Sequence, residues 1–170
     1  MATETIQYTV LQKEQSIEIR EYNDILLAST KTDPSNYYDS GFNRVFQYIS
    51  GQNETNTKIS MTSPVVSYQE GGTLVTGFYV PSKYDKTTVP KPKGEVYIDT
   101  IETAVYVVVT FYGGWTKENY EEHHQLLLDY ITLHNYQIKS KPFTMRYNAP
   151  YIPDHQKRNE IAYQISNYTG

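Results

Sequence analysis

The sequence predicts an α+β fold in which a strand pair, a helix and a further strand pair occur twice. Two segments, residues 33–51 and 116–134, repeat apolar side chains at helical spacing. Short apolar or alternating stretches flank each segment, as is typical of strands. A connection with three prolines, residues 81–94, separates the two sets. There is no residue-level repeat, and this pattern alone leaves ferredoxin-like and other α+β sandwiches open.

The first half is expected to surround its helix with strands. Ile17 and Ile19 alternate with Glu18 and Arg20, so the strand that they form has one apolar and one polar face. Glu70 is followed by two glycines, which favour a hairpin turn. Strands are expected at residues 9–11, 17–22, 25–30, 59–68 (interrupted by Pro64) and 74–80.

The helix of the first half is expected over residues 33–51. Asp33 can cap its start, with Pro34 at the first helical position, and Gly51 can take the left-handed conformation that ends a helix. Its apolar face must be covered, by the sheet alone or by the sheet together with a ligand. That face carries Tyr38, Phe42, Val45, Phe46 and Ile49.

The second half repeats this arrangement. Thr116 is expected to cap a helix that runs to about His134. Glu118, Glu121 and Glu122 place negative charge in its first turns, where the helix dipole favours it. Strands are expected at residues 96–101, 103–112, 143–147 and 160–165.

Length and composition predict a single soluble domain. The 170 residues suffice for one core, with halves at about residues 8–80 and 95–166. The net charge is −4 and the basic residues are scattered, which argues against nucleic acid as a partner. We find neither a secretory signal nor an apolar run long enough to span a membrane, and therefore expect a cytoplasmic protein.

Few residues suggest catalysis or metal binding. The chain has no cysteine, which excludes disulfides, cysteine nucleophiles and thiolate ligands. The four histidines follow no metal-binding spacing, and neither a nucleophile elbow nor a phosphate loop occurs. We therefore assign no catalytic residue and leave a metal ligand unassigned. His123 and His124 are adjacent on the expected helix, so only one of them can face the core, and we expect surface positions for His123, His124 and His155. The fourth histidine, His134, shares the broad face of the helix with apolar residues.

Six short segments of the chain form a recognisable set. One is the run KISMTSPV at residues 58–65. The others are Gly41-Phe42 and residues 17–22, 48–53, 78–81 and 157–161. In this order they resemble the SOUL family of haem-binding proteins, over about Tyr8 to Ser166. The resemblance implies a distorted, barrel-like antiparallel sheet flanked by two helices.

For function, the resemblance implies noncovalent binding of haem or a related tetrapyrrole, a small hydrophobic ligand, for carriage or buffering. A flat macrocycle needs apolar surface, and its propionates need a cation. The helix over residues 33–51 contains no histidine, so the axial ligand stays unassigned. The candidate cofactor-binding residues are Phe42, Arg44, Val45, Phe46, Ile49 and Met61. We expect Phe42, Phe46 and Met61 to face one common cavity.

Two other functions stay open. The implied fold is similar to that of effector-binding domains, so the same cleft could serve a small-molecule sensor or a hydrolase. A buried carboxylate with a raised pKa would indicate this function. Alternatively, the chain is a protein-interaction module without a ligand, and a cleft filled by its own side chains would indicate that.

Overall fold

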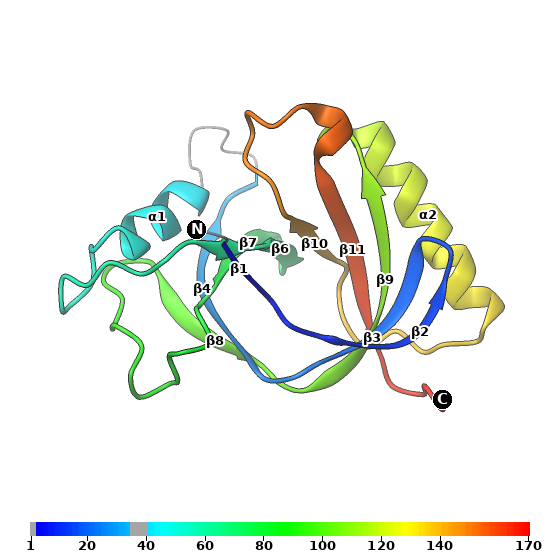
Figure 1. Ribbon diagram of the computed structural model, residues 1–170, viewed down its shortest axis with the longest axis horizontal. Coiled ribbons are helices and arrows are strands. Elements are labelled where there is room, and N and C mark those ends of the chain that lie inside the picture. The colour runs from blue at the N-terminus through cyan, green and yellow to red at the C-terminus, as the bar shows by residue number, and fades with distance from the viewer. Residues whose placement is uncertain (1–2, 35–40) are drawn as a thin grey trace. The chain divides into compact units, whose positions relative to one another are not determined.

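The computed structural model describes residues 3–34 and 41–170, and the chain forms two compact units (Figure 1). One unit combines Met1–Ile6 with Asp24–Glu102, and the other combines Gln7–Asn23 with Thr103–Gly170. Each unit has an antiparallel sheet with one helix packed against it. The α+β class and the duplicated arrangement of sheet and helix are therefore confirmed.

The sheet of the first unit has the strand order β6 (Val65–Glu70), β7 (Thr73–Tyr79), β4 (Ile25–Thr32), β8 (Tyr97–Ile101). β6 and β7 form the expected hairpin, and its two glycines, Gly71 and Gly72, have positive φ angles of 56° and 85°. β1 (Glu4–Thr5) and β5 (Thr62–Ser63) add a short parallel pair to this unit.

Helix α1 (Gly41–Ile49) contacts β4 and β7 of this sheet. Neither Asp33 nor Pro34, which follow β4, is helical, so the predicted start at these two residues is wrong. Residues 35–40, which include Tyr38, fall outside the described residues.

Glycines shape both ends of α1. A β-carbon on Gly41 would lie 2.8 Å from Oγ1 of Thr76, so glycine allows the helix to approach β7 closely. At the other end Gly51 has a φ angle of 115°, as predicted, and its amide donates to the carbonyl of Tyr48. The Gln52 amide donates to the carbonyl of Gln47, which completes a Schellman cap of the last turn.

The sheet of the second unit has the strand order β2 (Thr9–Glu14), β3 (Ile17–Tyr22), β9 (Ala104–Tyr112), β11 (Arg158–Ile165), β10 (Phe143–Arg146), with a short 3-10 helix η1 (Asp154–Gln156) before β11. Helix α2 (Lys117–Leu133) packs on β9 and β11. The predicted cap is confirmed, because Oγ1 of Thr116 accepts from the Asn119 amide at 3.1 Å. Neither α1 nor α2, nor any other described helix, is long and apolar enough to span a membrane.

Neither compact unit is one continuous stretch of the chain. β3 lies in the second unit and pairs with β9, whereas β8 lies in the first unit and pairs with β4. Each unit therefore contains a strand from outside the contiguous halves expected at residues 8–80 and 95–166. Side-chain periodicity identifies a strand but not its partner, because tertiary packing selects the partner.

Candidate functional site

One face of helix α1 belongs to the core of the first unit. Val45 and Ile49 are only 3% and 4% exposed and pack with Tyr48 against the sheet residues Ala28 and Phe78. These positions recur at helical spacing, so a single stripe of the helix is buried. Two of the candidate binding residues, Val45 and Ile49, are thus parts of this core.

A second flank of α1 is apolar but exposed. Phe42 and Phe46 are 42% and 46% exposed, and their rings stack with centroids 6.0 Å apart and planes inclined by 22°. We call this pair the aromatic flank. Met61, just before β5, is also exposed, at 47%. Exposed phenylalanines in contact with each other provide the apolar surface that a flat ligand covers.

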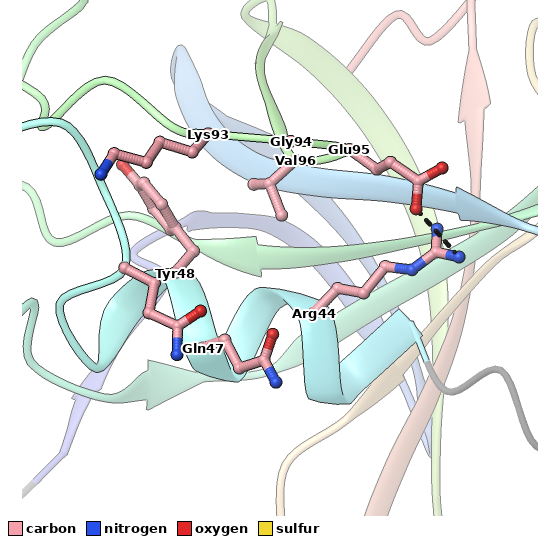
Figure 2. Close-up of a pocket in the computed structure, with 8 residues that line it drawn as sticks. Arg44, Gln47, Tyr48, Lys93, Gly94, Glu95 and Val96 are labelled. Atoms are coloured by element: carbon pink, nitrogen blue, oxygen red, sulfur yellow. Dashed lines mark ion pairs between the residues drawn. The ribbon is translucent and has the colours of Figure 1, made fainter.

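The remaining flank of α1 borders a groove of about 440 Å³, which we call the polar groove (Figure 2). Its lining comprises Arg44, Gln47, Tyr48, Gln52, Lys93, Gly94, Glu95 and Val96. Arg44 lies two residues from each aromatic-flank phenylalanine, about 200° around the helix axis. The groove and the aromatic flank are therefore on opposite sides of α1.

The guanidinium of Arg44 is held firmly at one end of the polar groove. It donates to Oγ1 of Thr30 at 3.2 Å and to the carbonyl of Lys31 at 2.9 Å. It also forms an ion pair with Glu95 at 3.1 Å, drawn as a dashed line in Figure 2. These contacts engage several N–H donors of the planar guanidinium group and fix the side chain in one orientation.

Tyr48 forms an apolar part of the groove and is also fixed. Its hydroxyl donates to the carbonyl of Pro90 at 2.5 Å, and burial raises its pKa to about 12, so the ring is neutral. Asn53, fully buried, donates to the carbonyls of Tyr48 and Thr57 and accepts from the Thr57 amide. This network holds the loop after α1 against the helix end.

The five candidate residues on α1 are thus divided among three faces of the helix, and Met61 lies outside it, just before β5. The polar groove is lined by Arg44 but by none of Phe42, Phe46 and Met61. That these three side chains share a cavity stays a prediction. Sequence reasoning missed Tyr48, Gln52 and Lys93 as groove residues, although the lysine-rich connection at residues 81–94 gave a signal for the last of them.

A buried ion pair lies in the second unit. The carboxylate of Glu160 accepts from both Nη atoms of Arg20, at 2.8 and 2.6 Å, and from the guanidinium of Arg158 at 2.9 Å. The hydroxyls of Thr110 and Tyr147 donate to it as well, at 2.6 and 2.5 Å. Both Glu160 and Arg20 are essentially inaccessible to solvent.

This environment decides the ionisation of Glu160. Burial alone would raise its pKa, but the hydrogen bonds and the charge of Arg20 outweigh burial and hold the pKa at about 2. The carboxylate is therefore ionised and saturated with donors, which is the wrong state for a general acid or base near neutral pH. The raised pKa expected for a sensor or hydrolase is not found at this carboxylate.

His123 and His124 on α2 are half-buried, and both contact the sheet. His123 stacks on Phe111 with centroids 4.3 Å apart, and Nε2 of His124 lies 2.6 Å from the hydroxyl of Tyr163. Burial lowers the pKa of His124. The expectation of surface histidines is wrong for this pair, because large rings on β9 and β11 reach both faces that adjacent helical residues present. Among the described residues, no three histidine or acidic side chains gather as a metal site.

Comparison with known proteins decides the family. Residues 3–164 match the model of the SOUL heme-binding protein family. The chain belongs to the SOUL family. Among curated SOUL-like relatives, heme-binding protein 2 of Homo sapiens is 30% identical over 149 residues, which are 79% of this chain and 71% of that protein. Heme-binding protein 2 of Mus musculus is 27% identical over 147 residues, 80% of this chain and 72% of that protein.

The fold also resembles solved structures with little sequence similarity. The crystal structure of the EcmrR C-terminal domain has a TM-score of 0.68 and 11% identity, and covers 95% of this chain and 99% of that one. At this identity the likeness concerns the fold alone.

Proposed function

We propose that this chain binds haem or a related tetrapyrrole without a covalent bond, for carriage or buffering. Membership of the SOUL family and the names of its relatives support tetrapyrrole as the ligand class. The observation that carries the proposal is the aromatic flank of α1. Phe42 and Phe46 expose apolar rings on a helix whose neighbouring stripe, Val45 and Ile49, is already packed in the core.

The aromatic flank fits the macrocycle of a tetrapyrrole. Two stacked rings give a flat, apolar patch, and burying apolar area contributes about 25 cal/mol per Å². The patch lies on a helix fixed by the buried side chains Val45 and Ile49, so little order has to be created on binding. Met61 is the third exposed apolar candidate for this contact.

The residues of α1 do not fit the iron of haem. The helix has no histidine, and the hydroxyl of Tyr48 donates to Pro90 and has a raised pKa, so it offers no phenolate. Arg44 lies on the opposite flank, in an ion pair with Glu95, so propionates of a ligand on the aromatic flank do not reach it. Affinity then rests on apolar contact, and we expect it to be modest.

The test is a haem titration followed by absorption spectroscopy on Phe46→Ala. With 46% of a side chain of about 200 Å² exposed, full cover by the ligand would bury roughly 90 Å², worth about 2 kcal/mol. Partial cover gives about 1 kcal/mol, so the expected loss of affinity is about 5- to 30-fold.

Leu126→Ala is the matched control. Leu126 lies on α2 and is 45% exposed, so its truncation removes a similarly exposed apolar side chain away from α1. Affinity for haem should not change in this variant. Equal weakening by both replacements, or none by Phe46→Ala, would show that the aromatic flank is not the site.

The ligand-free interaction module is the second candidate, since the same exposed rings suit a protein partner. Absence of saturable haem binding by a folded protein would favour it.

A further inference from the structure

The polar groove is a cavity that tetrapyrrole binding on the aromatic flank does not use. Its volume of about 440 Å³ lies within the range of roughly 300 to 1,000 Å³ that is typical of small-molecule sites. The groove runs between α1 and the segment that precedes β8, and both sides belong to the first unit. It therefore has its own walls and its own chemistry.

The charges of the groove favour an anion. At one end Arg44 is paired with Glu95, whose side chain is 72% exposed. Lys93 lies at the opposite end, as Figure 2 shows, and has no ion-pair partner among the described residues. Two cations and one anion leave the lining with a net charge of +1. An exposed ammonium with no partner can exchange water for a carboxylate at little cost.

The surrounding chain reinforces this charge. The connection at residues 81–94 contains four lysines and one aspartate, a local charge of +3 in a chain of net charge −4. Lys83, Lys86, Lys91 and Lys93 are all exposed. Although the basic residues are scattered over the chain as a whole, this local excess of positive charge favours anions at this segment over the rest of a negative protein.

The uncharged residues of the lining indicate which chemical groups an anionic ligand carries besides its charge. Tyr48 and Val96 supply the apolar part of the lining, and both are almost fully buried, so they form a rigid floor with a small exposed area. The carboxamides of Gln47 and Gln52 supply hydrogen-bond donors and acceptors beside it. A flat unsaturated body packs well on such a floor.

We propose that the polar groove is a second binding site, for a small organic anion whose flat unsaturated body carries a carboxylate. Lys93 binds the carboxylate, and Tyr48 and Val96 pack against the body. Arg44 keeps its contacts to Thr30, Lys31 and Glu95, and so acts as a fixed wall of the site.

The test uses benzoate as the probe and the full chain without haem. In amide-proton and nitrogen correlation spectra, a benzoate titration should give saturable shifts at the Gly94 amide and at the side-chain amides of Gln47 and Gln52. Lys93→Glu should weaken benzoate binding by about tenfold. Lys86→Glu is the matched control, because it makes the same charge change at an exposed lysine outside the groove lining, and it should change the affinity less than about twofold.

Three results would overturn the proposal. One is the absence of saturable shifts at the groove amides. Another is equal weakening by Lys93→Glu and Lys86→Glu, which would reduce the effect to general charge. The third is binding of inorganic phosphate as tight as that of benzoate, which would remove the flat body from the recognition. Phe46→Ala should leave benzoate binding unchanged, so this site and the haem site fail or succeed separately.

Discussion

Replacement of Glu160 by glutamine tests the largest buried electrostatic interaction of the second unit. Glu160→Gln keeps the shape of the side chain and removes its charge. Arg20, 1% exposed, and Arg158 then face each other without the carboxylate that both contact at 2.6–2.9 Å in the wild type. Arg20 keeps its ion pair with Glu18 at 2.7 Å, but both arginines lose the carboxylate between them, and the interior solvates the remaining charge poorly.

The expected loss in the free energy of unfolding is about 3 to 5 kcal/mol. Removing one partner of a buried ion pair costs about this much in general. The pKa leads to a similar figure: a decrease from 4.5 to about 2 at roughly 1.4 kcal/mol per unit corresponds to about 3 kcal/mol. Since domains are stable by about 5 to 15 kcal/mol, the variant should lose a large part of its stability.

The same pKa predicts the pH dependence. A carboxyl whose pKa is lower in the folded state contributes its full stabilisation above the unfolded pKa, near 4.5, and loses it as the pH falls toward 2. The wild type should therefore lose this stability between about pH 4.5 and 2. The variant lacks the titrating group, so the difference between the two proteins should shrink over this range.

Urea unfolding followed by tryptophan fluorescence measures both effects. Trp115 is the single tryptophan of the chain and lies in the second unit, so it reports on that unit. Glu121→Gln is the control, because Glu121 is 62% exposed and its ion pair with Lys117 is long, at 3.9 Å. The reasoning is refuted if Glu160→Gln costs less than about 1 kcal/mol at neutral pH, or if the difference from wild type persists at low pH.

Two further replacements test the helix ends. Gly41→Ala places a β-carbon 2.8 Å from Oγ1 of Thr76 and should destabilise the first unit by about 1 to 3 kcal/mol; unchanged urea unfolding would contradict the close approach of α1 to β7. Thr116→Ala removes the cap of α2 and should cost about 1 kcal/mol, seen as a fall of about 2 to 4 °C in Tm, whereas Thr116→Ser should retain most of the stability. A Tm for Thr116→Ala equal to that of the wild type would show that the cap is not needed.

Local signals in the sequence were sufficient to predict the helix ends that are set by a single residue. Thr116 and Gly51 act through their own side-chain or backbone properties, and both lie where predicted. The start of α1 was not predictable in this way. Asp33 and Pro34 form a good start signal, yet neither is helical, and both directly follow β4, which pairs with β7 as far as Thr32.

The candidate site was predicted in composition but not in arrangement. The apolar stripe of α1 is real, yet Val45 and Ile49 face the core while Phe42 and Phe46 remain exposed. Spacing shows that residues share a side of a helix, but the position of the sheet decides which edge of the stripe is covered. For the same reason Arg44, although next to the stripe in the sequence, lies on the opposite flank.

The polar face expected for the strand at residues 17–22 proved to be buried. Arg20 lies on the face expected to be polar, yet it is 1% exposed and pairs with Glu160, which is 140 positions away. Glu18 of the same strand also pairs with Arg20, at 2.7 Å, but no local pattern signals the more distant partner that makes full burial tolerable. Predicting this contact requires the register of β3, β9 and β11, which brings Arg20 and Glu160 together.

The most direct test of the central claim, unligated tetrapyrrole binding on α1, is a haem titration of the wild type and of four single histidine-to-alanine variants. The residues replaced are His123, His124, His134 and His155. No histidine lies on α1, so we predict weak, saturable binding in all five proteins, with a Soret band that none of the four changes alters. Binding abolished by one of these replacements would identify that histidine as the axial ligand and contradict the unligated account, and the absence of saturable binding by the folded wild type would contradict tetrapyrrole binding itself.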